Sequence, residues 1–353
     1  ASTGMPTLSL YRAVDAPANE LGLRLYGKAQ PAPLSDVLPM LENMGLRVLT
    51  ETPYRVSPAG AETSVYVQDF TLVARGVASV DVPAVKDAFE ATFARVWTGA
   101  AESDGFNRLV LLAGLAAREV EVLRAYAKYL RQASIGYSQA YMEDALAHHP
   151  RIARRLVDLF LAAQDPVADK DADVRARGIA VEIEHLLDSV PNADEDKILR
   201  RFLNAIAVTL RTNFFQPDAQ GAAKGYVSFK LDSQKLVELP LPRPLVEIWV
   251  YSPRVEAVHL RGGRVARGGI RWSDRREDFR TEILGLMKAQ IVKNAVIVPV
   301  GSKGGFFVKR PPAPEAGRDA AIAEAIACYR IMMSGLLDLT DNITIDGIAP
   351  PRA

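Results

Sequence analysis

The sequence is poor in cysteine, in net charge and in long apolar runs. Its single cysteine, Cys328, excludes an intrachain disulfide and a Cys-rich zinc site, and it fits a reducing compartment. The 43 Lys and Arg almost balance the 42 Asp and Glu, so neither a polycation nor a disordered acidic chain is indicated. No stretch approaches the roughly 18 consecutive apolar residues of a membrane span, and the first residues lack the regions of a signal peptide. We expect a soluble, cytoplasmic protein of 353 residues in two or three domains, with no membrane partner.

Motifs for nucleotides and metals are also missing. The chain contains no GxxxxGK[ST] and no GxGxxG, so residues 301–305 are not predicted to be a phosphate loop despite their glycines and lysine. His148, His149 and His185 do not have the spacing of HExxH or a comparable ligand set. We therefore expect structural or surface histidines and no metal site.

The near-zero charge hides a strongly cationic segment. Residues 251–310 contain thirteen Lys or Arg and five Asp or Glu, an excess of eight positive charges, together with eight glycines. Glycine allows a ligand to approach the backbone closely, and the cations attract anions. This segment is where we expect a functional site.

The first hundred residues have the pattern of a small α/β module. Strand-like alternation and helical spacing give the order β-α-β-β-α, over residues 21–28, 34–44, 46–56, 65–75 and 81–98. Gly45 and Gly99 are expected just past the two helices, and Asp81 with Pro83 at the start of the second. This order predicts a ferredoxin-like, ACT-like module over residues 1–103. A plain packing or dimerisation role is its simplest interpretation.

The rest of the chain divides into a helical part and a mixed part. Residues 104–224 are predicted to be a helical linker, with helical periodicity to about residue 216 and one clear helix that carries Ile198, Phe202, Ile206 and Leu210 inward. Residues 225–353 are predicted to form a mixed α/β domain. Its expected elements are strands at 226–231, 245–251, 255–260 and 295–300, a helix from a Ser273 or Asp274 cap to Asn294, a loop at 301–305 and a helix at 315–337. The predicted fold class is multi-domain α+β.

The glycine-rich cationic segment has two further interpretations on residues alone. Two Arg-Gly-Gly repeats are weak evidence for RNA, because RNA-binding tracts of this kind are longer and disordered, and we expect no nucleic-acid partner. The other is a pocket for an anionic small molecule in which Arg267, Lys293 and Lys303 converge. Arg267 and Lys293 would then favour the uncharged amine of Lys303, which suits acid–base chemistry. A solvated basic face is the competing interpretation.

Residues 267–306 resemble the substrate-domain core of the large bacterial NAD-specific glutamate dehydrogenases. Residues 204–216 and 335–342 resemble segments that flank this core, and the first hundred residues resemble the ACT-like modules upstream of it. The small hexameric glutamate dehydrogenases share a looser pattern of Lys-Gly-Gly-x-Arg, Gln-x-x-Lys and Gly-Gly-x-Lys-Gly-Gly. The likeness implies a substrate domain of glutamate dehydrogenase type.

The resemblance implies a role for each matching residue. Arg267, with Gly268 and Gly269, takes the position that binds the distal carboxylate of the substrate. Gln290 and Lys293 match the pair at the α-carboxylate end. Lys303 matches the catalytic lysine, which polarises the bound water or carbinolamine oxygen.

The match departs from the small enzymes in three places. Arg replaces Lys at 267, which keeps the charge and adds a bidentate fork. Lys293 is two residues closer to Lys303, so Lys288 competes for the role of Lys293. Ser302 follows one glycine where the small enzymes have two.

The function implied for the full-length protein is NAD-dependent oxidative deamination of L-glutamate to 2-oxoglutarate and ammonia. The chain does not begin with Met, and Asp341 and Asp346 come too early for the family's catalytic aspartate. We expect an internal fragment, inactive alone, whose catalytic aspartate and NAD-binding Rossmann domain lie beyond residue 353. An amino-acid effector and a homo-oligomer are expected for the full-length enzyme. The alternative is a non-catalytic ACT-type module for amino-acid sensing or oligomerisation, with an anion-binding basic face.

Overall fold

The structure is a computed structural model that describes residues 4, 6–28, 30–57, 63–134, 136–167, 171–293, 300–344 and 347–349, with only the backbone of 291–293 and 342–344. The chain forms two compact units. The first contains residues 1–124 and 140–154, and the second contains residues 125–139 and 155–353. Each unit is described by itself.

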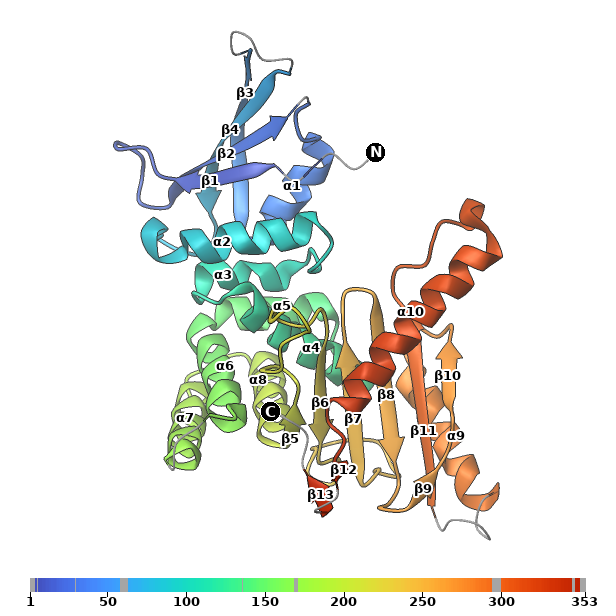
Figure 1. The fold of residues 1–353 in the computed structure, drawn as a ribbon. Coiled ribbons are helices and arrows are strands. Elements are labelled where there is room, and N and C mark those ends of the chain that lie inside the picture. The colour runs from blue at the N-terminus through green and yellow to red at the C-terminus, as the bar shows by residue number, and fades with distance from the viewer. Residues whose placement is uncertain are drawn as a thin grey trace. The chain divides into compact units, whose positions relative to one another are not determined.

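A four-stranded antiparallel sheet and two helices form the first part of the first unit (Figure 1). The elements are β1 (Thr7–Tyr11), β2 (Glu20–Lys28), α1 (Leu34–Asn43), β3 (Leu46–Val56), β4 (Val65–Ala74) and α2 (Val82–Trp97). The predicted β-α-β-β-α order is confirmed. Strand β1 is additional, and it pairs with β2 to give the sheet order β1-β2-β4-β3. One face of the sheet is buried, with Leu23 of β2 opposite Phe70 of β4.

The predicted helix boundaries of this module agree with the structure to within one residue. Gly45 follows α1 with a φ of +84°, which an L side chain rarely adopts. Asp81 is the N-cap of α2, where its carboxylate accepts a hydrogen bond from the Ala84 amide at 3.3 Å. Local capping chemistry therefore places both helices.

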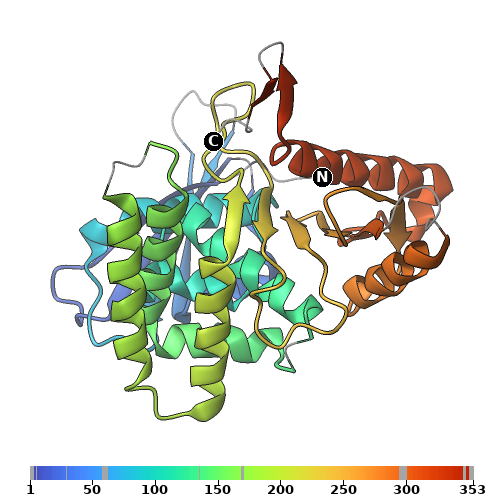
Figure 2. The same cartoon turned by 90° about the horizontal axis from the view of Figure 1, so that it is seen from below.

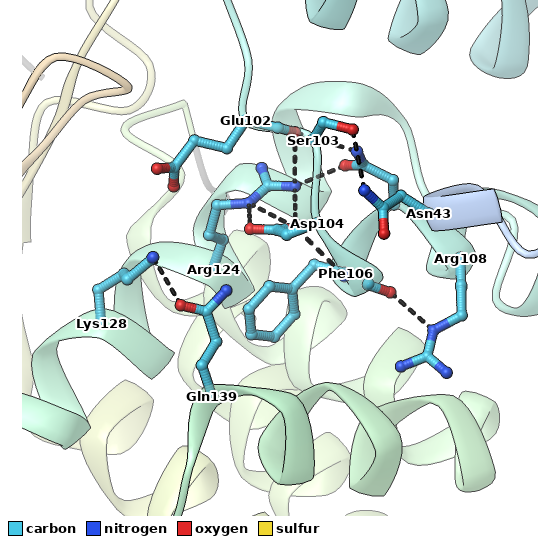
Figure 3. A network of polar contacts seen from close by, with 11 residues as sticks. Asn43, Glu102, Ser103, Asp104, Phe106, Arg108, Arg124, Lys128 and Gln139 are labelled. Carbon is cyan, nitrogen blue, oxygen red and sulfur yellow. Dashed lines mark hydrogen bonds and ion pairs between the residues drawn. The ribbon is translucent and has the colours of Figure 1, made fainter. Parts of the chain in front are cut away.

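Helices fill the rest of the first unit. They are η1 (Gly105–Arg108), α3 (Leu109–Leu112), α5 (Gln139–His148) and the first parts of α4 (Ala117–Gln132) and α6 (Pro150–Gln164). The buried guanidinium of Arg124 holds this region together (Figure 3). It donates to both carboxylate oxygens of Asp104, at 2.8 to 3.1 Å, and to Asn107 Oδ1 at 2.5 Å. Asn43, at the end of α1, donates to Ser103 beside this network at 3.0 Å.

The second unit opens with helices and then changes to strands earlier than predicted. Helices α7 (Ala172–Leu187) and α8 (Ala193–Ala207) are followed at once by β5 (Thr209–Thr212). Ile198, Phe202 and Ile206 are buried as predicted. The prediction for Leu210 is wrong, because the chain has already become a strand there and the side chain is exposed.

A seven-stranded mixed sheet is the centre of the second unit. It consists of β5, β6 (Val227–Leu231), β7 (Val246–Tyr251), β8 (Val255–Arg261), β9 (Ala266–Arg267), β10 (Ile270–Ser273) and β11 (Val300–Val308). Strands β5 to β8 form an antiparallel meander, and β11 adds antiparallel to β8. Strands β9 and β10 both pair parallel with β11.

Two helices cover opposite faces of this sheet (Figure 2). Helix α9 (Phe279–Lys293) packs on β8 and β11, and helix α10 (Gly317–Leu337), preceded by η2 (Pro314–Ala316), packs on β6, β7, β8 and β11. The hairpin of β12 (Asn342–Thr344) and β13 (Gly347–Ala349) follows α10. We call the two sides of the sheet the α9 face and the α10 face.

One helical stretch in the described part of the chain, Pro314–Leu337, is long and apolar enough by length and composition to cross a membrane. Such a single helix is weak evidence, because core helices pass the same test. Its Ala325, Cys328 and Met332 lie in the core against Ala257 and Phe306 of the sheet. Packing accounts for only part of the apolar composition of α10, because Ile322, Ile326 and Leu337 are exposed.

Two predictions in this unit are corrected. The helix does not begin at Ser273 or Asp274 but at Phe279, because Ser273 ends β10 and its hydroxyl donates to Glu282 at 2.6 Å. Residues 301–305 are not a loop but the first half of β11. Their glycines serve close packing: a Cβ on Gly305 would come within 2.2 Å of Ile283 of α9. Of the strand predicted at 295–300, residues 295–299 lie outside the described residues.

Candidate active site

A β-α-β unit brings the sequence-predicted site residues to one end of the sheet. Strand β10 leads into α9, and α9 returns the chain to the start of β11, which lies parallel and adjacent to β10. The last turn of α9 is therefore at the same end of the sheet as Val300 and as β9 (Figure 1). Gln290 and Lys293 lie in that last turn, and Arg267 lies in β9.

Arg267 and Lys303 share the α9 face. Arg267 is paired with Gly301, and Lys303 follows Gly301 by two positions, so strand alternation directs both side chains to one side. Arg271 of β10 is on this face too, since it pairs with Gly305 and its Nε donates to Glu282 of α9 at 2.9 Å. Two predicted cations therefore face the side on which α9 packs.

Gly268 and Gly269 shape the space around the Lys303 ammonium. A Cβ on Gly268 would lie 1.5 Å from the Ser302 carbonyl oxygen, so only glycine fits between β9 and β11 there. A Cβ on Gly269 would lie 3.7 Å from Lys303 Nζ, and the Gly269 carbonyl accepts a hydrogen bond from the Gly304 amide at 3.0 Å. The two glycines thus hold the strands close and place bare backbone beside the ammonium.

Six of the thirteen cations of the segment have carboxylate partners, whereas two of the predicted site residues do not. Carboxylates hold Arg254, Arg271, Arg275, Arg276, Arg280 and Lys309. Among the described residues, neither Arg267 nor Lys303 makes an ion pair or a side-chain hydrogen bond. Arg267 is exposed and Lys303 is half-buried. Both cations are therefore available to an anionic ligand.

The carboxylate nearest to Lys303 along the sheet is neutralised by another partner. Glu247, Leu260 and Lys303 stand in one row across β7, β8 and β11, which separates the lysine from Glu247 by about 10 Å. The guanidinium of Arg280, in the first turn of α9, takes the completely buried Glu247 carboxylate with two hydrogen bonds, from Nε at 2.8 Å and from Nη2. Glu247 is therefore already engaged by Arg280 and is not an ion-pair partner of Lys303.

The Arg280–Glu247 pair also fixes α9 on the sheet. Tyr129 of α4 donates its hydroxyl to Glu247 Oε2 at 3.1 Å. Burial and the charge of Glu247 raise the pKa of Tyr129 well above its usual value. Burial acts to lower the pKa of Arg280, but the charge of Glu247 outweighs it and the pKa is raised. The phenol stays neutral and the guanidinium charged over the whole physiological range.

Sequence reasoning missed Glu247 and Arg280. A signal was present, because Glu247 is a lone carboxylate in the otherwise apolar strand β7 and Arg280 lies next to the buried Phe279. A charge at a core position of a strand requires a partner of opposite sign. Pairing these two charges is enough to place the first turn of α9 beside β7.

The α-carboxylate side of the predicted site lies on α9. Gln290 is half-buried and Lys288 is exposed. The side chain of Lys293 lies outside the described residues. The assignment of Lys293 or Lys288 to the α-carboxylate stays a prediction, as do the roles of Gln290, Arg267 and Lys303.

Within the described ranges, no group of three or more His, Cys, Asp or Glu side chains is arranged to hold a metal ion. Cys328 is a buried residue of α10, and burial with the nearby Glu324 raises the pKa of its thiol to about 12.

Comparison with known protein families identifies this set of elements. Residues 182–353 match the family model "Bacterial NAD-glutamate dehydrogenase, catalytic domain". Residues 101–166 match "Glutamate dehydrogenase, helical motif 3", and residues 6–85 match "Glutamate dehydrogenase, ACT3 domain". This chain belongs to the bacterial NAD-glutamate dehydrogenase family. The resemblance stated from residues 267–306 is confirmed, and so is the fold class of an ACT module, a helical segment and a mixed α/β domain.

Individual members of the family are similar over nearly the whole chain. The NAD-specific glutamate dehydrogenase of Halomonas elongata is 49% identical over 345 residues, and that of Pseudomonas aeruginosa is 49% identical over 349, in each case 98% of this chain. The Mycobacterium tuberculosis protein of the same name is 50% identical over 88% of it. The chain spans about one fifth of the length of these curated relatives, 20 to 21%. The predicted domain boundaries at 103/104 and 224/225 stay predictions.

Proposed function

We propose that this chain carries the substrate side of a glutamate dehydrogenase active site, in an enzyme that oxidises L-glutamate to 2-oxoglutarate and ammonia with NAD. The observation that supports this most is the placement of Arg267 and Lys303 on one face without carboxylate partners among the described residues, beside Gly268 and Gly269. A dicarboxylate substrate needs cations at both ends and a donor at its reacting oxygen. The resemblance to the glutamate dehydrogenase family assigns residues of these types to the chain, and the α9 face carries two of them, Arg267 and Lys303.

The proposed roles follow from charge and position. The Arg267 guanidinium binds the distal carboxylate with its bidentate fork. Gln290 and Lys293 bind the α-carboxylate from the last turn of α9, with Lys288 as the competitor for the second role. Together they hold the α-carbon in one orientation, which lowers the entropic cost of reaction.

Lys303 is proposed to act at the reacting carbon. Its ammonium donates a hydrogen bond to the oxygen on the α-carbon of 2-oxoglutarate or of the carbinolamine, and it stabilises negative charge that develops there. In the direction of glutamate oxidation, the neutral amine accepts a proton from the water that attacks the imine carbon, and the resulting ammonium donates to the carbinolamine oxygen. The bare backbone of Gly269 leaves room for that oxygen beside Nζ.

The residues present do not fit the NAD cofactor. The chain has no GxGxxG turn, and its large sheet is antiparallel except for the pairs that β9 and β10 make with β11, unlike a dinucleotide-binding fold. No residue of this chain is therefore assigned to NAD or to the hydride step. The proposal covers substrate binding and the chemistry at the substrate oxygen.

Calorimetric titration of the chain with 2-oxoglutarate tests the substrate side directly. We expect binding that weakens at least about tenfold in Arg267→Gln, because a charge-assisted bidentate contact is lost. Arg318→Gln removes an equally exposed arginine at the start of α10, and it controls for the change in net charge. Equal weakening by both substitutions, or none by Arg267→Gln, would refute the proposal.

The alternative, amino-acid sensing by the first unit, is favoured by one observation. A pocket of about 350 Å³ is lined by groups of both signs, including Glu42, Arg75, Arg108 and Glu143. Acidic and basic side chains in one pocket suit the ammonium and the carboxylate of a free amino acid. Titration with amino acids should then give binding that Arg75→Gln weakens and Arg267→Gln does not, whereas the reverse pattern supports the substrate site alone.

A further inference from the structure

A second cationic cavity lies on the α10 face, on the opposite side of the sheet from Lys303. Its volume is about 640 Å³, and strands β6 to β8 and the C-terminal end of α10 line it. The lining is mostly apolar, with Ile248, Met333 and Leu336 among its members. Its cationic members are Lys230, Arg261 and Arg264.

Strand register places like charges directly opposite each other beside this cavity. Arg211, Lys230, Ile248, His259 and Gly304 form one row across β5, β6, β7, β8 and β11. Like charges at opposed positions of an antiparallel pair destabilise a sheet. A face built only for packing would avoid the pairing of Arg211 with Lys230.

Lys230 is the cation of this row that makes no ion pair among the described residues. Arg211 is paired with Asp341 at 2.7 Å, and it donates to the Leu339 carbonyl at 3.1 Å. Arg261 donates to two carbonyls of its own turn, Gly263 and Arg264. Among the described residues, Lys230 makes no hydrogen bond and no ion pair. Burial and the neighbouring Arg211 lower its pKa, while Asp341, which lines the same cavity and is paired with Arg211, acts in the opposite direction without outweighing them.

His259 adds a polar group without adding charge. Burial, with a smaller effect of Arg261, lowers the pKa of His259 to about 4, so its imidazole is neutral at pH 7. A neutral imidazole both donates and accepts hydrogen bonds. The cavity therefore combines an ammonium that has no ion-pair partner among the described residues, a neutral polar ring and an apolar floor.

We propose that this cavity binds a small organic anion whose carboxylate or phosphate group contacts Lys230 and whose apolar body lies on Ile248, Met333 and Leu336. The charge of the ligand then supplies the ion-pair partner that Lys230 lacks among the described residues, and the apolar floor selects against fully hydrated anions. The site is distinct from the proposed substrate site, because Lys303 lies on the other face of the sheet. Nothing in the reaction at Lys303 requires it.

Four simple probes test this with the chain in solution: hexanoate, hexyl phosphate, inorganic phosphate and 1-hexanol, each titrated by calorimetry. We expect at least one of the two amphipathic anions to bind, and the pair distinguishes a carboxylate from a phosphate site. Phosphate and hexanol should bind at least about tenfold more weakly, because each offers only half of the contacts. Failure of both amphipathic anions to bind at about 10 mM would overturn the proposal, since that range covers the affinity expected for ligands of this size.

The lysine is tested with a matched pair of substitutions. Lys230→Met keeps the length of the side chain and removes its charge, and it should weaken binding at least about tenfold. Lys235→Met removes a lysine that is exposed and paired with Asp232, and it should leave binding unchanged, as should Lys303→Ala. Equal affinity of wild type and Lys230→Met would overturn the proposal, and loss of binding in Lys303→Ala would assign it to the substrate site instead.

A measurement on the wild-type chain covers the case in which Lys230→Met does not fold. The NMR signal of the His259 ring should shift on addition of the bound anion, while those of His148, His149 and His185 should not. A His259 signal that does not move during the titration would overturn the proposal.

Discussion

Two groups of cations in this molecule have opposite surroundings. In the first unit, Arg124 of α4 is almost completely buried. It donates hydrogen bonds to Asp104 and Asn107, which lie shortly before α4 in the chain (Figure 3). In the second unit, Arg267 and Lys303 share a face with no carboxylate bound to them among the described residues. The first cation is part of the fold, and the second pair is available to a ligand.

The contrast teaches that the partners of a cation indicate its role better than its position does. A buried charge with a full set of hydrogen bonds stabilises one conformation, and losing a partner costs the whole desolvation penalty. A cation without a partner contributes little to folding and much to the binding of an anion. The predictions below test this contrast, from the largest expected effect to the smallest.

The largest effect is expected for Lys303→Ala in the full-length enzyme. NAD-dependent glutamate oxidation should fall by about 10²- to 10⁴-fold, the range for a lost acid–base group. The free energy of unfolding of the chain should change by less than about 0.5 kcal/mol, because no partner is lost. Steady-state kinetics and urea unfolding measure the two quantities, with Lys235→Ala as the control. A wild-type rate would remove the role assigned to Lys303.

Arg124→Met should show the reverse pattern. Removing the guanidinium leaves the Asp104 carboxylate without its main partner, and the chain should lose about 3–5 kcal/mol of unfolding free energy. Binding of 2-oxoglutarate at temperatures where the variant is folded should equal that of wild type. Urea unfolding and calorimetry check this, and a stability loss below about 1 kcal/mol would contradict the structural role.

Gly268→Ala should affect both properties at once. The new methyl group would meet the Ser302 carbonyl, so β9 and β11 must separate, at a cost of about 1–3 kcal/mol. The displacement also moves Lys303, which follows Ser302, so activity should fall. Gly285→Ala is the control, at an exposed position of α9 where a Cβ meets nothing within 4 Å. It should raise the free energy of unfolding by up to about 1 kcal/mol. Equal behaviour of the two variants would contradict the close packing.

His259 predicts a pH dependence of stability that does not involve the catalytic face. Its folded-state pKa of about 4 lies below the ordinary 6.5, so between these pH values the unfolded chain binds a proton that the folded chain does not. The stability it contributes is present above pH 6.5 and is lost as the pH falls towards 4, by up to about 3 kcal/mol. His259→Gln should flatten this decline in urea unfolding, and His185→Gln, at an exposed position, should not.

The smallest effect is expected for Arg24→Met in the first unit. Arg24 is paired with Asp69 across β2 and β4 at 3.0 Å and lies over the Tyr11 ring, but its side chain is 45% exposed. Solvent screens such a pair, and the loss should be at most about 1 kcal/mol. A loss close to that of Arg124→Met would break the distinction between exposed and buried pairs.

The sequence predicted local structure well where capping residues and periodicity agree. Gly45 and Asp81 placed the ends of α1 and α2, and the alternation of residues 46–56 matched β3. It failed for β1 and β5, because short strands carry too little periodicity and their partners lie far along the chain. The glycines of residues 301–305 led to the wrong prediction of a loop, because glycine is typical of turns. In the structure these glycines allow β11 to lie close to α9.

By itself, the sequence determined the family, the order of elements and the residue types of the site, because a forty-residue pattern of Arg, Gly, Gln and Lys is specific whatever surrounds it. Only the tertiary structure decided which cations are available. Arg280 takes Glu247, while Lys303 stands two strands away in the same row. The physical reason is that the pairing of charges depends on strand register and helix placement. The buried apolar surface of the sheet determines both the strand register and the helix placement. The local sequence around a lysine encodes neither of them.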